Sequence, residues 1–113
     1  ANVPDPTALE WIAVRSPSPD ALSRVHRRLH LGEREALALG VELSDALLIL
    51  DDGDARREAA ALGLHVIGTV GVLVLAKHGG HVNAITPLLD APAALGFRLD
   101  DAVRARALRM TGE

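Results

Sequence analysis

The chain has 113 residues, enough for one domain with a modest core and too few for two. Apolar residues make up 49% of it, aromatic residues only 2%, and the net charge is −3, so neither a strongly basic nucleic-acid surface nor a base-stacking platform is expected. The lack of cysteine excludes disulfides and thiolate sites, and with no signal peptide or membrane-spanning run in the sequence we expect a cytoplasmic protein.

The predicted elements follow an irregular N-terminal lead-in. Glu10–Arg15 (EWIAVR) is β-rich and predicts a short strand. Ser18 as the N-cap, with Pro19 in the first helical position, predicts a helix that runs to about His30. A second helix begins near Gly32 in GEREALALGVEL, with acids in its first turn, where the helix dipole favours them.

Strands and helices then alternate. Ala46–Leu50 is short and wholly apolar, which predicts a strand buried on both faces. DARREAAALGL predicts a short helix with Gly63 at its C-cap, and His65–Thr69 predicts the next strand. A buried helix in GVLVLAKHGG and two helices divided near Gly96 complete the chain. This order predicts a parallel sheet with right-handed crossovers, in which Ala46–Leu50 and Val66–Thr69 are neighbouring or near-neighbouring strands.

Acidic residues crowd the end of the first of these two strands, at Asp51, Asp52 and Asp54. Ligands gather at the carboxyl ends of parallel strands, and Glu33 and Glu35 face the same edge if their helix packs antiparallel to the strand. Such a cluster needs a divalent cation, and its oxygen ligands suit Mg²⁺ or Mn²⁺ and phosphodiester hydrolysis. Alternatively, the three aspartates cap the following helix and the two glutamates complement a dipole. The residues alone leave both interpretations open.

Two further patterns are interpreted as structural. His26 and His30 lie one helical turn apart, but they sit among arginines, which favours a solvated face over a metal pair. Gly68 and Gly71 in GTVGVLVLAK offer backbone N–H groups to a phosphate, but the spacing is not that of a P-loop. We interpret them as a close junction between strand and helix.

Three stretches carry a family pattern: LGEREALALGVEL, DALLILDDGDARREAAALGL and HVIGTVGVLVLAKHGG. With the tail PLLDAPAALGFRLDDAV, they resemble the PIN-domain superfamily of metal-dependent nucleases, in a prokaryotic branch related to the VapC-type toxin ribonucleases. The resemblance implies a three-layer α/β/α fold with a parallel sheet. It also implies one PIN-like domain over residues 1–113 that covers the C-terminal two-thirds of the family fold.

The resemblance implies site residues as well. Glu33 or Glu35 corresponds to the family's acid at a helix start, and Asp51 corresponds to its acid after a strand. Asp52 is a neighbouring acid and Asp54 a weaker candidate. We therefore expect Asp51 and the two glutamates to be catalytic, and these residues with Asp52 to bind Mg²⁺ or Mn²⁺.

The family fold begins with a strand that carries another metal-binding Asp, and no stretch before Trp11 fits it. The resemblance thus implies an N-terminally truncated fold with weak metal binding. One function is a ribonuclease, with RNA as substrate and, if it is a toxin, an antitoxin as partner. The alternative is a catalytically silent module for oligomerisation or interaction. A sheet without its central strand exposes apolar side chains, which predicts a homodimer or higher oligomer with an apolar contact above roughly 1,000 Å².

Overall fold

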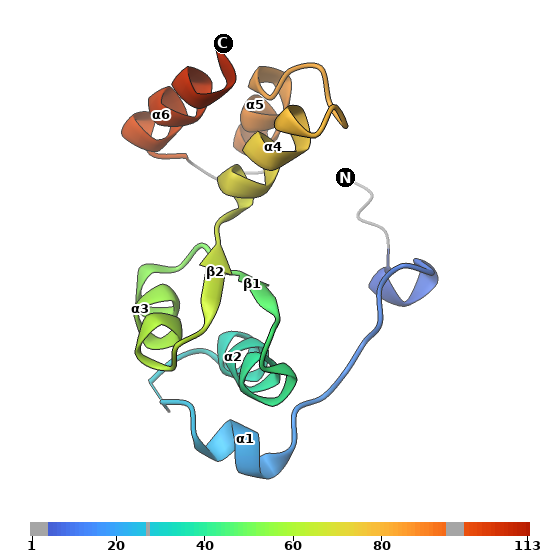
Figure 1. Ribbon diagram of the computed structural model, residues 1–113, viewed down its shortest axis with the longest axis vertical. Helices are drawn as coiled ribbons and strands as arrows, with labels where there is room; N and C mark the ends of the chain where they lie inside the picture. The colour runs from blue at the N-terminus through green and yellow to red at the C-terminus, as the bar shows by residue number, and fades with distance from the viewer. Residues whose placement is uncertain (1–4, 27, 95–98) are drawn as a thin grey trace. The chain divides into compact units, whose positions relative to one another are not determined.

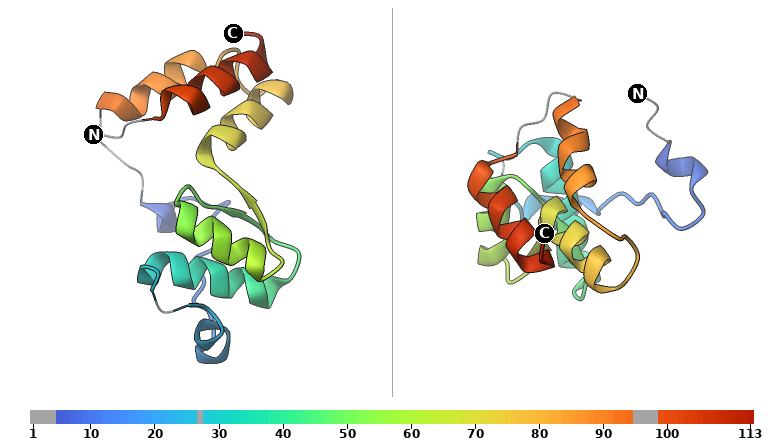
Figure 2. Two further views of the ribbon diagram at one scale, coloured as in Figure 1. Left: turned by 90° about the vertical axis from the view of Figure 1, so that its left-hand side faces the viewer. Right: turned by 90° about the horizontal axis from the view of Figure 1, so that it is seen from above.

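The computed structural model describes residues 5–26, 28–94 and 99–113, except for the side chains of residues 91–94. Over these residues the chain is a series of short helices interrupted by a pair of strands (Figures 1 and 2). The elements in chain order are η1 (Pro6–Ala8), α1 (Pro19–Ser23), α2 (Leu31–Leu43), β1 (Leu47–Ile49), α3 (Gly53–Ala61), β2 (His65–Ile67), α4 (Thr69–His78), α5 (Thr86–Ala94) and α6 (Asp101–Thr111). The break predicted near Gly96 lies outside the described residues.

The chain divides into two compact units. Unit 1 contains residues 1–48 and 52–66, and unit 2 contains residues 49–51 and 67–113. The helices α1, α2 and α3 belong to unit 1, and α4, α5 and α6 belong to unit 2. Both strands begin in unit 1 and end in unit 2. The single domain expected over residues 1–113 stays a prediction.

β1 and β2 are neighbours in a small parallel sheet, which confirms the α/β class and the predicted pairing. The Leu50 N–H continues the ladder beyond β1 by donating to the Ile67 carbonyl at 3.0 Å. Helix α3 lies between the strands in sequence, as a crossover connection requires. Both strands are shorter than predicted, with 3 residues each. β2 ends at Ile67 because Gly68 is the N-cap of α4 and Thr69 is its first residue.

β1 is buried on one face only, which corrects the prediction of a strand buried on both faces. Leu48 is 7% exposed, whereas Leu47 and Ile49, which alternate to the opposite face, are 58% and 59% exposed. Within residues 5–26, 28–94 and 99–113, β2 is the only strand beside β1 and no element covers this second face. A parallel strand normally has cover on both faces, so β1 presents an unusual apolar surface.

The core of unit 1 lies where α2 and α3 pack against each other. It is built from Leu37 and Ala38 of α2 and Ala55 and Ala59 of α3, all 0% exposed. The small alanines let the two helices approach closely. Gly40 lets α2 approach β1 as well, because a Cβ at this position would lie only 2.8 Å from Leu48 Cδ1.

The predicted ends of two helices are partly confirmed. Ser18 caps α1, since its Oγ accepts from the Ala21 N–H at 3.1 Å. The C-cap of α3 is Leu62 instead of Gly63. Gly63 follows this cap with φ of +73°, a left-handed conformation that glycine adopts without a steric penalty.

Helix α1 ends at Ser23 and does not reach His30, so the predicted length was wrong. After Ser23 the chain leaves the helical path. Val25 is buried there, at 2% exposure, and the N–H of His26 bonds to a residue of another helix. That N–H, of His26, donates to the Glu58 carboxylate of α3 at 3.1 Å instead of to a carbonyl of its own helix. Tertiary contacts therefore override the local helical pattern.

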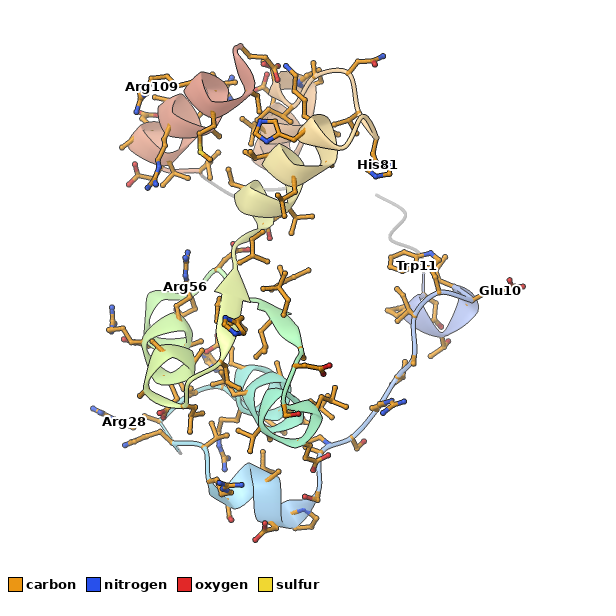
Figure 3. The ribbon with its side chains drawn as sticks, viewed as in Figure 1. Glu10, Trp11, Arg28, Arg56, His81 and Arg109 are labelled. Carbon is orange, nitrogen blue, oxygen red and sulfur yellow. The ribbon has the colours of Figure 1, made fainter. Side chains whose placement is uncertain are left out.

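The predicted strand at Glu10–Arg15 is absent, although these residues are described. The segment is irregular, and its Ile12 N–H donates to the Leu9 carbonyl in a local turn. Trp11 and Val14 are 81% and 69% exposed, and Figure 3 shows Glu10 and Trp11 on this segment. A β-rich sequence forms a strand only when another strand offers its backbone groups, and none is paired with this segment.

Unit 2 has its own core, formed by four buried side chains from α4, the loop after it, α5 and α6: Val74, Ile85, Leu89 and Ala107. α4 was predicted to be buried, but Val74 is its only buried residue and Leu75 is 57% exposed. α4 packs mainly on α6. One main packing partner is too little to surround a helix, so the other side chains of α4 stay partly or fully in solvent. No helix of the described residues is both long and apolar enough to cross a bilayer.

Gly71 supports the interpretation of a close junction between strand and helix. A Cβ at Gly71 would lie 2.6 Å from Cγ1 of Ile67, the last residue of β2. This carbon is next to the Ile67 backbone and has little freedom to move aside. The sharp passage from β2 into α4 therefore requires glycine.

Glu113 holds the start of α5. Its carboxylate accepts from the N–H groups of Ile85 and Thr86 at 2.9 and 3.1 Å, and from the Thr86 hydroxyl at 2.6 Å. The Lys77 ammonium lies 3.0 Å away in an ion pair. The Ile85 N–H, the Thr86 hydroxyl and the Lys77 ammonium all favour the charged form, and they hold the pKa of Glu113 well below its usual range.

Replacing Gly71 by alanine is expected to lower the free energy of unfolding by about 1 kcal/mol or more, because overpacking outweighs the gain in helix propensity. Gly32 of α2 is the control, since a Cβ there meets no atom within 4 Å. Gly32→Ala should stabilise the protein by up to about 1 kcal/mol. Urea unfolding of both variants measures the difference, and equal stabilisation by the two would contradict the packing argument.

Glu113→Gln is expected to lower the melting temperature at pH 7, where the carboxylate is charged and fully bonded. Because the folded pKa lies below the ordinary value of 4.5, this stabilisation is present above pH 4.5 and disappears as the pH falls towards the folded pKa. The gap between parent and variant should therefore narrow on acidification. Glu10→Gln, which removes the same charge from the irregular segment, is the control and should keep the melting temperature of the parent at pH 7.

Candidate metal centre

Asp51 follows β1 and binds the first residue of α4 through both of its carboxylate oxygens. Oδ1 accepts from the Thr69 N–H at 2.8 Å, and Oδ2 accepts from the Thr69 hydroxyl at 2.6 Å. The N-cap residue of α4, Gly68, has no side chain with which to cap the helix itself. Asp51 supplies that cap from the end of the strand, and its side chain remains exposed.

Asp52 and Asp54 serve α3 instead. Asp52 is its N-cap, because Oδ2 accepts from the Ala55 N–H at 3.0 Å. Asp54, in the first turn, forms an ion pair with Arg57 in which both side chains are more than 70% exposed, at 72% and 75%. The capping interpretation is thus confirmed for Asp52, whereas Asp51 caps α4 and not the helix that directly follows it.

Glu33 and Glu35 both lie near the start of α2, but only Glu33 is in its first turn. Both side chains are partly exposed. Residues of an α-helix follow one another at about 100° around the axis, so these two point about 200° apart. A single cation is therefore expected to reach one of them and not both. The geometry does not indicate which of the two glutamates that would be.

The structure brings Asp51 together with Thr69, a residue that sequence reasoning missed. The available signal was Gly68, which has no side chain to cap a helix that begins at Thr69, so an acceptor from elsewhere in the chain was an option. Glu33 and Glu35 belong to unit 1 and Asp51 belongs to unit 2. That these acids lie together and bind one cation therefore stays a prediction. Across the described ranges, no three His, Asp or Glu side chains are grouped as a metal site.

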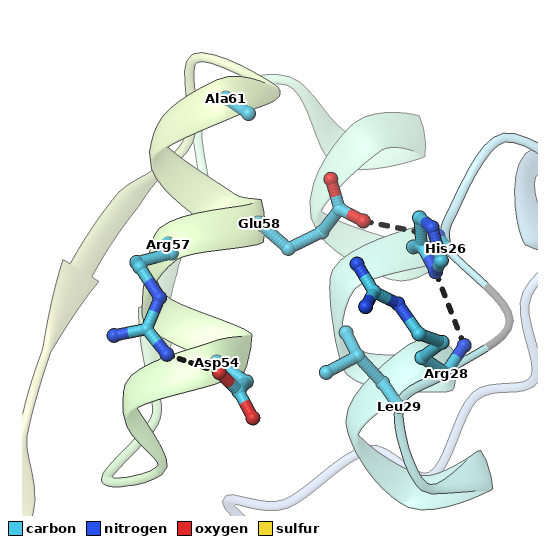
Figure 4. Close-up of a pocket in the computed structure, with 7 residues that line it drawn as sticks. All are labelled: His26, Arg28, Leu29, Asp54, Arg57, Glu58 and Ala61. Atoms are coloured by element: carbon cyan, nitrogen blue, oxygen red, sulfur yellow. Dashed lines mark hydrogen bonds and ion pairs between the residues drawn. The ribbon is translucent and has the colours of Figure 1, made fainter.

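A pocket in unit 1 was also missed (Figure 4). It has a volume of about 360 Å³ and lies between α3 and the segment after α1, with seven lining residues: His26, Arg28, Leu29, Asp54, Arg57, Glu58 and Ala61. Of the arginines in the sequence, Arg28 and Arg57 line this pocket and were the available signal for it. The pocket combines cationic and anionic groups, so it offers no strong field of either sign.

The same pocket explains why His26 is a poor metal ligand. Its Nδ1 accepts from the Arg28 N–H at 3.2 Å, and its backbone N–H is held by Glu58. One ring nitrogen is thus already occupied, and the guanidinium of Arg28 lies on the same pocket wall. This agrees with the interpretation of a structural histidine near a solvated face.

The comparison with protein families decides the class of the chain. A family model described as PIN domain matches residues 1–113. The chain belongs to the PIN-domain family. Searches among curated proteins and among solved structures each found no match. The resemblance seen in the sequence is therefore confirmed at the level of the family.

Membership of the PIN-domain family gives the position of Asp51 a functional meaning. A PIN domain is a nuclease-type domain in general terms. In this PIN domain the acid after β1, Asp51, is exposed at the carboxyl end of a parallel strand. Ligands gather at that edge in open parallel sheets. Asp51 is accordingly the best-placed acid of the candidate metal centre.

The structural role of Asp51 can be measured by a double-mutant cycle with Thr69. Asp51→Ala is expected to cost about 1 kcal/mol of unfolding free energy, the typical loss for a helix cap, and Thr69→Val should cost less because the N–H contact survives. Since the two residues share their bonds, the double variant should be less destabilised than the sum. Asp45→Ala, an exposed loop position, is the control. Additive losses would show that the contact contributes nothing.

Proposed function

We propose that this PIN domain is a ribonuclease that hydrolyses RNA phosphodiester bonds with Mg²⁺ or Mn²⁺. The observation that carries the proposal is the exposed carboxylate of Asp51 at the end of β1, in a chain that belongs to a nuclease-type family. Asp52 is the neighbouring acid, and Glu33 or Glu35 is the proposed second ligand from α2.

The donor chemistry at Asp51 fits such a cation. An ionised carboxylate has about four lone-pair sites, and Thr69 uses one on each oxygen. Each oxygen therefore retains a site for a hard cation, which prefers oxygen ligands. The start of α4 opposes binding, because the helix dipole is positive there. Weak affinity is the expected result.

The residues of the chain would hold and orient the ion. Asp51 is fixed by its two bonds to Thr69, so its free lone pairs keep a constant direction. Asp52 caps α3 through Oδ2, which leaves Oδ1 for the cation or its water shell. When bound, Mg²⁺ or Mn²⁺ supplies activation of a water and stabilisation of charge on the phosphate.

RNA is the proposed substrate, recognised through its phosphates more than its bases. With only 2% aromatic residues, the chain has little means of stacking bases. In the more specific form of the proposal, the protein is the toxin of a toxin–antitoxin pair, and an antitoxin covers its acidic site.

A second candidate is a catalytically silent PIN-like module that acts in oligomerisation or interaction. Two observations favour it: no three acids are grouped within the described residues, and the Leu47–Ile49 face of β1 is open to solvent. Cation-dependent cleavage of RNA separates the two candidates, since only the nuclease needs a cation for its reaction.

Isothermal titration with Mn²⁺ tests the nuclease proposal. The parent chain should bind weakly, and Asp51→Asn should lower the affinity at least about tenfold, as expected for loss of a direct ligand. Thr69→Val keeps the carboxylate but removes the hydroxyl that orients Oδ2, so it should lower the affinity less than Asp51→Asn does. Asp45→Asn controls for the loss of one negative charge.

The same four proteins are then incubated with single-stranded RNA and Mn²⁺, with a chelator as the blank. Cleavage by the parent that is lost in Asp51→Asn and kept in Thr69→Val supports the nuclease. Equal Mn²⁺ affinity in the parent and Asp51→Asn would contradict the assignment of Asp51. Binding without cleavage would favour the silent module.

A further inference from the structure

The pocket of unit 1 has two walls that come from different parts of the chain. One face of α3 forms the first wall, with four residues at helical spacing: Asp54, Arg57, Glu58 and Ala61. The segment after α1 forms the second wall with three residues: His26, Arg28 and Leu29. All seven belong to unit 1, so the pocket lies within one compact unit.

The two walls are fixed to each other by contacts of the fold. The His26 N–H of the second wall donates to the Glu58 carboxylate of the first at 3.1 Å. Neighbours of the wall residues in the chain are buried at 2% exposure or less, namely Val25, Ala55 and Ala59. The packing of unit 1 therefore forms the pocket before a ligand arrives, which lowers the entropic cost of binding.

A carboxylate and a guanidinium face each other in this pocket without forming an ion pair. Figure 4 shows Glu58 and Arg28 reaching into the space between the walls from opposite sides. No ion pair among the described residues includes either of them. Glu58 uses Oε2 for the His26 N–H, which leaves Oε1 available. The space between the two charges suits a ligand that has N–H donors for Glu58 and an anionic group for Arg28.

His26 and Arg57 add donors for an anionic group. His26 Nδ1 accepts from the Arg28 N–H at 3.2 Å, so in the neutral ring the proton is on Nε2, which is a donor. Arg57 binds Asp54 through Nη2 and keeps its other guanidinium N–H groups. A phosphate has several oxygens that accept such bonds, and guanidinium groups bind it with matching geometry.

We propose that this pocket binds one guanine nucleotide, with the phosphate at Arg28 and Arg57 and the base edge at Glu58. Guanine alone among the four RNA bases has two adjacent N–H donors on its Watson–Crick edge, and a carboxylate accepts both at once. Glu58 Oε2 retains a second lone-pair site beside the His26 bond. That the nucleotide belongs to an RNA strand rests on the proposed function, whereas the pocket itself needs no cation and no cleavage.

The size and lining of the pocket suit one nucleotide. Its volume of about 360 Å³ lies at the lower end of the range of small-molecule sites, roughly 300–1,000 Å³. Leu29 and Ala61 offer apolar contacts to a base, and among the described residues the lining has no Phe, Trp or Tyr. Hydrogen bonds at one edge of the base, and not stacking between aromatic rings, therefore provide the discrimination.

Isothermal titration of the full chain with GMP, AMP, CMP and UMP in EDTA tests the pocket without a cation. GMP should bind at least about tenfold more tightly than the other three, as two charge-assisted bonds allow. Glu58→Gln keeps an oxygen for the His26 N–H but places a donor where guanine needs an acceptor, so it should remove the preference for GMP. Arg28→Ala, at an exposed position, should weaken the binding of all four nucleotides.

Arg56→Ala is the matched control, because Arg56 is an exposed arginine of α3 that does not line the pocket. It should bind GMP as the parent does, and circular dichroism checks the fold of each variant. No binding of GMP at millimolar concentration would overturn the proposal. Equal affinity for the four nucleotides, or a preference for GMP that survives in Glu58→Gln, would overturn it as well.

A second measurement separates RNA from a free nucleotide as the source of the guanine. Fluorescence anisotropy in EDTA compares a single-stranded oligocytidylate that contains one guanosine with the same oligomer without it. Tighter binding of the guanosine oligomer by the parent, but not by Glu58→Gln, assigns the pocket to RNA, whereas binding of GMP alone assigns it to the free nucleotide. Asp51→Asn should bind GMP as the parent does, so a failure of Mn²⁺-dependent cleavage contradicts the nuclease and not the pocket.

Discussion

The bond between the Asp51 carboxylate and Thr69 ties the end of β1 to the beginning of α4. α4 starts with a glycine cap, so without this carboxylate its first N–H groups would lack a side-chain acceptor. The same bond fixes the direction of the acid that is best placed to bind a cation. The start of α4 and the candidate site therefore share one side chain.

Two glycines allow helices to lie close to the strands. Gly71 lets α4 leave β2 without a collision with Ile67, and Gly40 lets α2 approach Leu48. Where cover is missing, apolar side chains stay in solvent, as Leu47 and Ile49 do on β1. A parallel sheet gains stability chiefly from elements packed on its faces. Within the described residues this stabilisation is present on one face of β1 only.

Local sequence signals predicted many elements correctly. The α2 helix, α3, the parallel pair of strands and the caps at Ser18 and Asp52 follow from short-range chemistry: apolar periodicity, side-chain oxygens at helix starts and glycine at helix ends. The family also could be recognised from the sequence, and the match over residues 1–113 confirmed it. The acidic residues themselves were evident, but their partners were not.

Where the local signals predicted an element wrongly, contacts between distant parts of the chain are the cause. α1 stops at Ser23 because Glu58, far along the chain, takes the His26 N–H. EWIAVR stays irregular because no strand of the described residues pairs with it. Asp51 caps α4 through a contact over 18 residues, which no local pattern specifies. By itself the sequence determined most of the helices, the β1–β2 pair and the family, since these depend on neighbouring residues. The lengths of elements, the exposed face of β1 and the partners of each acid required the tertiary structure, because they depend on which distant backbone and side-chain groups meet.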